Sequence, residues 1–336
     1  MTKRRAAAVP ETIEWRGGVH LIGTPLWCDA SGARDACFLS AADVVIRGRR
    51  PSPGRAGRAS PSLGHAQIVC TDLTRRLLPD AGARARALAA PLDRPFALGD
   101  LRVELCSAGG RPGGAQVVVD IAGRRVLYAG RVFPRGGGLA GPAAARKADV
   151  LVVDATFAAA RFRFPPLDEA RAAVAAWVDE VIAEDATPIV VVEPLGGALE
   201  LAGALASHGT VVAHRAIADV ARTLAAAGFP APKLTRLGRK VPRGGILLWP
   251  AGTPLTAAAR VCDRPRAALA SPWAQDPRAV ARAKVAAAFP LSLVADREQL
   301  EGFLGSVGAT EVVTIGASPA VAAELGARPL GQLTLF

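Results

Sequence analysis

Between residues 149 and 250 the chain alternates apolar runs with helical segments, and this alternation constrains the fold more than any other feature. The apolar runs are 149–157, 188–194, 210–214 and 245–250, and the helical segments between them are 166–184, 197–207 and 216–228. On the first helix, Ala173, Val174, Trp177, Val181 and Ile182 fall on one face at three-to-four spacing. Strands that alternate with helices predict βαβ units and a parallel sheet.

The first half of the chain reads as short strands separated by turns. The expected strands are 19–23, 37–40, 43–46, 66–70, 101–107, 115–121 and 124–130. One helix is expected at 71–78 with Thr71 or Asp72 as its N-cap, and a hairpin is expected to turn near Ala122–Gly123. Segment 260–279 shows no regular pattern, and residues 284–326 return to a β-α-β-α order.

Length and composition favour a protein with a large core and no membrane segment. The chain has 336 residues, of which 51% are hydrophobic, and no apolar run approaches the roughly 18 residues of a membrane span. No apolar stretch follows the basic start, so we expect a cytoplasmic protein. The five cysteines are odd in number and lack a C-x-x-C pair, which predicts reduced thiols and neither disulfides nor a thiolate zinc site.

The formal net charge of +12 comes almost entirely from arginine. Such an excess suits a polyanionic partner, and nucleic acid is the first candidate. A GC-rich genome would give the same enrichment in Ala, Arg, Gly and Pro without any selection for binding.

Several separate stretches match the motifs of one known family. They are "LWCDA", "DVVI" with the loop that follows it, "GHAQIVCTDLTRRLL", "AGGRPGGAQVVVDIAGRRVLYAGRV", "ADVLVVDATF", "FPLSLVADREQLEGFL" and "VVTIG". Together they resemble the metallo-β-lactamase-fold nucleases that carry a β-CASP insert. The most similar group is the bacterial ligase-associated DNA exonucleases, also described as mRNA 3′-end-processing-like.

The resemblance implies an α/β protein, with a metallo-β-lactamase-like αββα sandwich and an inserted α/β domain of the β-CASP type. The sandwich domain would comprise residues 15–170 and 280–328, the insert residues 171–279, and a C-terminal tail residues 329–336.

The ligands that this family uses are missing here. In the family, His and Asp side chains of these motifs bind two zinc ions, which activate water and hold the scissile phosphate. The ligand positions in this chain are Gly48, Arg50, Ser52, Pro53, Gly110, Arg131, Val294 and Ile315. Only the carboxylate at Asp154 is retained. Although the family implies zinc, we therefore expect no metal or other cofactor and no confident catalytic residue.

Arginines stand in or near the lost ligand positions. Arg131 replaces the bridging aspartate with a permanent cation, which would repel a zinc ion. The nucleic-acid-binding set predicted from this pattern is Arg47, Arg49, Arg50, Arg55, Arg111 and Arg131. Such a cleft would hold a phosphate backbone without cutting it. The alternative is drift, in which a disused pocket fills with arbitrary residues.

The other candidate residues carry weaker signals. Asp154 either keeps a functional role or caps a turn and pairs with an arginine. The four histidines are His20, His65, His208 and His214, all outside the motif positions, and His65 is expected in a surface turn. "GGRPGG" at 109–114 lacks the G-K-[ST] of a P-loop, and "PLGGAL" at 194–199 is a weak phosphate site before a helix.

The last residues, "GQLTLF", resemble the bacterial sliding-clamp-binding peptide. Gln332 would anchor by hydrogen bonds, while Leu333, Leu335 and Phe336 would enter an apolar pocket. The alternative is an edge strand that folds back on the body of the protein.

Three functions remain open on the sequence. The first is a catalytically inactive relative of these exonucleases that binds nucleic acid, DNA in preference to RNA, and docks on the sliding clamp in repair or replication. The second is an active metal-dependent nuclease that uses Asp154 and unrecognised ligands. The third is a non-enzymatic subunit that pairs with an active homologue or with repair proteins.

Overall fold

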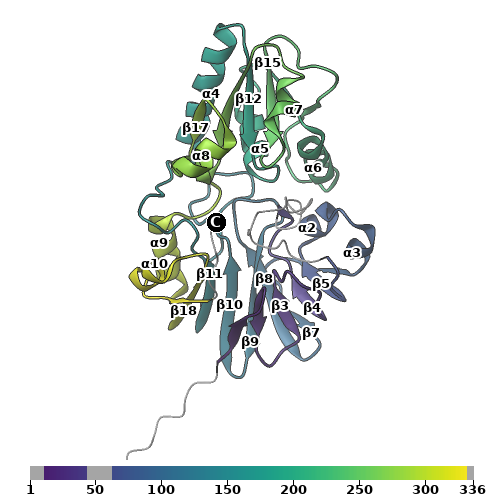
Figure 1. Ribbon diagram of the computed structural model, residues 1–336. Coiled ribbons are helices and arrows are strands. Elements are labelled where there is room, and N and C mark those ends of the chain that lie inside the picture. Colours follow the sequence, from purple (N-terminus) through teal and green to yellow (C-terminus); the bar gives the residue numbers. More distant parts are fainter. Residues whose placement is uncertain (1–10, 44–62, 331–336) are drawn as a thin grey trace, which may run out of the picture.

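The computed structural model describes residues 11–43 and 63–330, and their strands form three sheets. Two sheets pack against each other, and the third forms a separate body with its own helices, above them in Figure 1. The arginines predicted at 47, 49, 50 and 55, the ligand positions 48, 50, 52 and 53, and the clamp-like peptide 332–336 lie outside the described residues.

The first sheet holds six short strands in sequence order. These are β1 (Ile13–Trp15), β2 (Val19–Leu21), β3 (Leu26–Cys28), β4 (Ala36–Phe38), β5 (Gln67–Cys70) and β6 (Ala87–Ala89). The second sheet has seven strands, with parallel and antiparallel pairings. In spatial order they are β19 (Arg328–Pro329), β18 (Glu311–Ile315), β11 (Val150–Asp154), β10 (Arg124–Gly130), β9 (Ala115–Ile121), β8 (Leu101–Ser107) and β7 (Phe96–Leu98).

The two sheets and the helices on their outer faces form four layers. Phe38 and Val69 of the first sheet pack against Val103 and Leu105 of the second, so the two inner faces share one core. The outer face of the second sheet is covered by α9 (Arg297–Val307) and α10 (Pro319–Glu324). The outer face of the first sheet packs against the region of α2 (Asp72–Leu77) and α3 (Ala81–Ala85).

The third sheet is entirely parallel in its described pairings. Its spatial order is β14 (Thr235–Arg236), β13 (Thr210–Ala213), β15 (Gly245–Pro250), β12 (Thr187–Val192), β16 (Pro265–Ala270) and β17 (Ala287–Phe289). The helical elements of this body are α4 (Leu167–Ala183), α5 (Gly197–Ala204), α6 (Arg215–Ala226), α7 (Leu255–Ala259), the 3₁₀ turn η1 (Pro272–Gln275) and α8 (Pro277–Ala283).

The chain is thus a mixed α/β protein, as predicted, and a body with its own parallel sheet interrupts the two-sheet sandwich. The elements of this body run from α4, which begins at Leu167, to β17, which ends at Phe289. The domain bounds expected from the sequence, with an insert at 171–279, stay a prediction. We refer to residues 167–289 as the insert.

The segment that leads from the sandwich into the insert is packed against the insert by aromatic side chains. Phe157 and Phe162 of this segment pack on Trp273 in η1 of the insert, with ring centroids 4.8 and 5.9 Å away. The backbone N–H of Phe164 donates to Asp296, and the amide of Gln275 donates to the carbonyl of Arg163. Such close packing of the connections favours a fixed insert orientation.

Several local predictions are confirmed. Thr71 is the N-cap of α2, and its hydroxyl accepts from the N–H of Thr74. The β9–β10 hairpin turns at Ala122 and Gly123, which both have positive φ. On α4, Val174, Trp177 and Val181 are buried as expected.

Other expectations are wrong. Segment 260–279 is not irregular, because it contains β16, η1 and α8. Ala173 lies on the exposed side of α4, and Val178 is buried in its place, so the apolar face is rotated slightly from the prediction. His65 lies in no surface turn, because it is fully buried and its Nδ1 accepts from the N–H of Arg34.

The five cysteines are free and buried, in agreement with the prediction of reduced thiols. Burial raises the pKa of the Cys37, Cys70 and Cys106 thiols to about 12, so these side chains act as small hydrophobes. No described helix combines the length and the apolar character needed to cross a bilayer.

Candidate functional site

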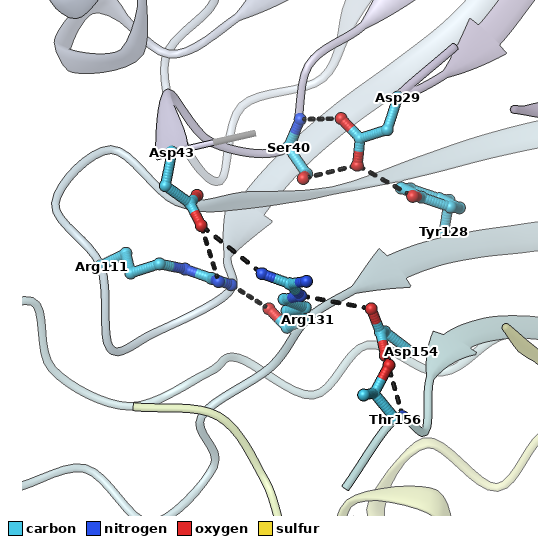
Figure 2. Close-up of polar contacts among 8 residues, drawn as sticks. All are labelled: Asp29, Ser40, Asp43, Arg111, Tyr128, Arg131, Asp154 and Thr156. Atoms are coloured by element: carbon cyan, nitrogen blue, oxygen red, sulfur yellow. Dashed lines mark hydrogen bonds and ion pairs between the residues drawn. The ribbon is translucent and has the colours of Figure 1, made fainter. Parts of the chain in front are cut away.

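The carboxyl ends of β10 and β11 bring Arg131 and Asp154 together. The two strands run parallel with Gly130 opposite Val153, so the residues that follow, Arg131 and Asp154, meet at the same sheet edge. The Arg131 Nε donates to the Asp154 carboxylate at 3.3 Å. The other Asp154 oxygen accepts from the backbone N–H of Thr156 at 2.9 Å, which fixes the carboxylate (Figure 2).

A second arginine and a second aspartate complete this group. The Arg111 Nη1 and the Arg131 Nη1 lie 3.4 and 3.6 Å from the same oxygen of Asp43. The Arg111 Nη2 donates to the carbonyl of Arg131 at 2.9 Å. We call Asp43, Arg111, Arg131 and Asp154 the arginine–aspartate centre (Figure 2).

The centre is buried and nearly neutral as a unit. The side chains of Asp43 and Arg111 are each 5% exposed, that of Asp154 is 3% exposed, and that of Arg131 is 22% exposed. Burial alone would lower the pKa of Arg131, but the carboxylates of Asp154, Asp43 and Glu193 raise that pKa above its ordinary value. Two cations therefore meet two anions where water is largely excluded, and each charge depends on the others.

The loop "GGRPGG" places Arg111 in this group. Gly109 and Gly110 have positive φ, and a Cβ on Gly110 would lie 2.6 Å from the carbonyl of Leu293. The same loop is held from the other side, because the hydroxyls of Thr71 and Thr74 both donate to the carbonyl of Gly113 at 2.8 Å. The glycines thus serve close packing, and Arg111 enters the interior from a fixed backbone.

The motif positions singled out in the sequence converge here, although they lie far apart in the chain. Asp154 pairs with Ile315 across β11 and β18, and the N–H of Ala295 donates to the carbonyl of Val132 at 2.8 Å. Gly110 abuts Leu293, which precedes Val294. The positions 110, 131, 154, 294 and 315 therefore surround one end of the second sheet.

A neighbouring contact ties the two sheets together. Asp29 follows β3 and has a positive φ of 47°. Its carboxylate accepts from the Ser40 N–H at 2.9 Å, from the Ser40 hydroxyl at 2.6 Å and from the Tyr128 hydroxyl at 2.9 Å (Figure 2). Because Ser40 follows β4 and Tyr128 lies on β10, Asp29 joins the first sheet to the second beside the centre.

The insert closes over the centre. A cavity of about 20 Å³ separates Arg111 from Glu193, Leu195 and Leu293, which is room for a single water molecule. The amino end of α5 packs on the same residues, because a Cβ on Gly196 would lie 2.8 Å from Leu293 and 3.3 Å from Arg111. The segment 194–199, expected as a weak phosphate site, is therefore packed against Arg111 and Leu293.

These residues do not fit a divalent metal ion. Within the described ranges, no three His, Cys, Asp or Glu side chains lie close enough to share a metal. The guanidinium of Arg131 lies between the two carboxylates that could otherwise contribute. At about 4 Å it would repel a divalent ion by about 8 kcal/mol at an effective dielectric constant of about 20.

The histidines have separate partners in separate places. They are His20, bonded to Glu14 and to the carbonyl of Thr24; His65, buried beside Arg34; His208, bonded to Asp179; and His214, the N-cap of α6. None of them belongs to the arginine–aspartate centre.

Sequence reasoning singled out Arg111, Arg131 and Asp154 but missed Asp43, Glu193 and the Asp29 contact. Asp43 is the last described residue before positions 44–62, and its partner Arg111 lies 68 positions further along the chain. The sequence held only an indirect signal for these carboxylates. A buried arginine needs a carboxylate partner, so acidic residues next to strands at this edge of the sheet were candidate partners of Arg111 and Arg131.

The chain shares sequence with a distant relative. No family model matches the chain. A protein named "Probable DNA ligase" from Opitutus terrae is 27% identical over 316 residues, which cover 91% of this chain. The match covers 29% of that protein, so the chain spans less than a third of the relative's length.

Proposed function

We propose that this chain is a DNA-associated relative of the metallo-β-lactamase/β-CASP exonucleases that has no metal-dependent nuclease activity and works beside DNA ligation or repair. One observation carries the proposal. Arg131 forms ion pairs with Asp154 and Asp43, at the position where the resembled nucleases have a metal-bridging carboxylate.

The arrangement of the sheets supports the family part of the proposal. A two-sheet sandwich with helices on both outer faces is interrupted by a body with a parallel sheet. The five described motif positions converge at one end of the second sheet, where the family would place its metals. A chance match of short motifs would not be expected to gather them at one point.

The link to DNA has two supports. A relative that contains a region similar to nearly all of this chain is named a probable DNA ligase. The net charge of +12 suits a polyanionic ligand. Because most of that relative lies outside the match, we propose a DNA ligase as a partner of this chain.

Within this proposal, the arginines of the centre hold the protein together and leave phosphate binding to other residues. Arg111 is buried, and both Arg111 and Arg131 face carboxylates. The arginines at 47, 49, 50 and 55 remain predicted DNA contacts. Docking of the peptide Gln332–Phe336 on the sliding clamp also remains a prediction, and deletion of these residues with unchanged clamp retention would remove it.

A paired assay of binding and cleavage tests the proposal. Fluorescence anisotropy with labelled single-stranded and duplex DNA measures binding, and gel analysis with Mg²⁺, Mn²⁺ or Zn²⁺ measures cleavage. We expect salt-sensitive binding and intact DNA under every metal condition. Metal-dependent cleavage that EDTA abolishes, and that Asp154→Asn also abolishes while the variant stays folded, would support an active nuclease instead.

A further inference from the structure

The two faces of the insert carry opposite charge. One face is covered by α4, whose acidic residues are Asp168, Glu169, Asp179 and Glu180, and whose only base is Arg171. On the other face, α7 and the segments around it pack on the sheet. The stretch 233–266 that contains them carries eight basic residues and one acidic residue, Asp263. Figure 1 shows α4 and α7 on opposite sides of the β12–β15 layer.

All eight basic side chains of this stretch are exposed. They are Lys233, Arg236, Arg239, Lys240, Arg243, Arg260, Arg264 and Arg266, and we call this set the basic face. The stretch thus has a net charge of +7, from eight positive and one negative residue.

Apolar residues between these bases fix the stretch on the sheet. Val241, Cys262 and their partly buried neighbours pack on Ile189, Leu247 and Trp249 of the sheet. The N–H of Val241 donates to the carbonyl of Val261 at 2.8 Å, which joins the 237–244 loop to the segment after α7. The bases of both segments therefore form one surface.

Few carboxylates neutralise the basic face. Lys240 pairs with Asp263, Arg243 with Asp185, and Arg266 with Glu184, at 2.7–3.1 Å. These pairs are exposed, and such pairs contribute little free energy. Among the residues that the structure describes, no carboxylate lies within ion-pair distance of Lys233, Arg236, Arg239, Arg260 or Arg264.

We propose that the basic face of the insert binds the phosphate backbone of duplex DNA. Guanidinium groups match phosphate geometry, and several of them on one rigid surface can contact successive phosphates. Single-strand binding also needs aromatic side chains for base stacking. The one aromatic residue of this stretch, Trp249, is buried, so backbone contact to a duplex is favoured.

This inference rests on the proposed DNA association and adds the surface that performs it. That surface is separate from the arginine–aspartate centre and from the cleft arginines predicted on the sequence. It also explains how a DNA-associated protein can bury its central arginines and still retain cationic side chains for a partner.

The test compares two triple variants that remove the same charge. Arg236→Gln/Arg239→Gln/Arg260→Gln removes three unpaired bases from the basic face. Arg94→Gln/Arg102→Gln/Arg282→Gln removes three exposed arginines elsewhere and serves as the matched control. Anisotropy with a fluorescein-labelled duplex of random sequence is measured between about 50 and 200 mM salt. Circular dichroism and thermal unfolding confirm that both variants are folded.

We expect the basic-face variant to bind at least about tenfold more weakly, with a salt dependence reduced by about two to three counterions, and the control to change by less than about threefold. Equal losses in both variants, or no loss in the basic-face variant, would overturn the basic-face proposal and leave the DNA association standing. Binding of single-stranded DNA alone by the wild-type protein would overturn the basic-face proposal only, whereas no binding of either single-stranded or duplex DNA would overturn the DNA association as well.

Discussion

The arginine–aspartate centre and the basic face of the insert use the same side chain in opposite ways. In the centre, Arg111 and Arg131 are enclosed and face the carboxylates of Asp43 and Asp154. On the basic face, Arg239 and its neighbours are exposed, and five bases have no carboxylate within ion-pair distance in the described chain. A buried cation must be neutralised within the protein, whereas an exposed one remains available to a partner.

The largest expected effect follows removal of the central cation. Arg131→Met would leave the carboxylates of Asp154 and Asp43 buried without full compensation. We expect the free energy of unfolding to fall by about 3–5 kcal/mol, measured by urea denaturation.

The double variant Arg131→Met/Asp154→Asn is the control for this prediction. It removes the uncompensated carboxylate of Asp154 together with the cation, so it should recover part of the lost stability. A loss of unfolding free energy below about 1 kcal/mol in the single variant would mean that the buried carboxylates do not depend on Arg131 for charge compensation.

An intermediate effect is expected at the contact between the insert and the sandwich. The carboxylate of Glu200 on α5 is buried, accepts from the N–H of Leu139 at 2.7 Å and pairs with Arg171 of α4. Glu200→Gln keeps the shape but removes the charge, so the free energy of unfolding should fall by about 2 kcal/mol. An unchanged denaturation midpoint would show that the Glu200–Arg171 ion pair, which lies within the insert beside this contact, adds nothing to stability.

A smaller, pH-dependent effect is expected at Glu311. Burial alone would raise the pKa of this carboxyl, but hydrogen bonds from Arg328 and Arg124 lower it overall. Its contribution to stability is therefore present above the unfolded pKa of about 4.3 and is lost as the pH falls through the folded pKa. Wild type should exceed Glu311→Gln in unfolding free energy by less than about 1 kcal/mol near neutrality.

Denaturation at several pH values measures this difference, which should vanish in acid. A difference that grows as the pH falls would contradict the assigned sign.

The smallest effect on stability is expected on the basic face. Arg239→Met makes the same chemical change as Arg131→Met, but the side chain is exposed and has no carboxylate partner within the described chain. The free energy of unfolding should change by no more than about 0.5 kcal/mol in the same denaturation assay. A loss comparable with that of Arg131→Met would remove the contrast between the two regions.

Local patterns in the sequence predicted much of the fold. The three-to-four spacing of Val174, Trp177 and Val181 marked α4, and the turn at Ala122–Gly123 marked the β9–β10 hairpin. The strand Pro265–Ala270 escaped prediction because its residues have weak strand preference. Its strand conformation is stabilised by pairing with β12 and β17, which local sequence does not encode.

The candidate site was only partly predictable. Arg131 and Asp154 stand in recognisable motifs that end neighbouring strands, so their proximity could be inferred. The part played by Asp43 depends on contacts with Arg111 and Arg131, far along the chain, which no local pattern encodes. His65 was misjudged for a similar reason, because the Arg34 contact that accompanies its burial comes from a distant segment.

The proposed function depends on Arg131, which pairs with the carboxylates of the centre where the resembled nucleases hold a catalytic metal. The most direct test is the metal content of the wild-type protein, purified without chelator, incubated with excess Zn²⁺ and Mn²⁺, desalted and analysed by plasma mass spectrometry. We expect metal well below one equivalent per chain in protein that still binds duplex DNA. One or two tightly held equivalents, lost on Asp154→Asn, would contradict the proposal.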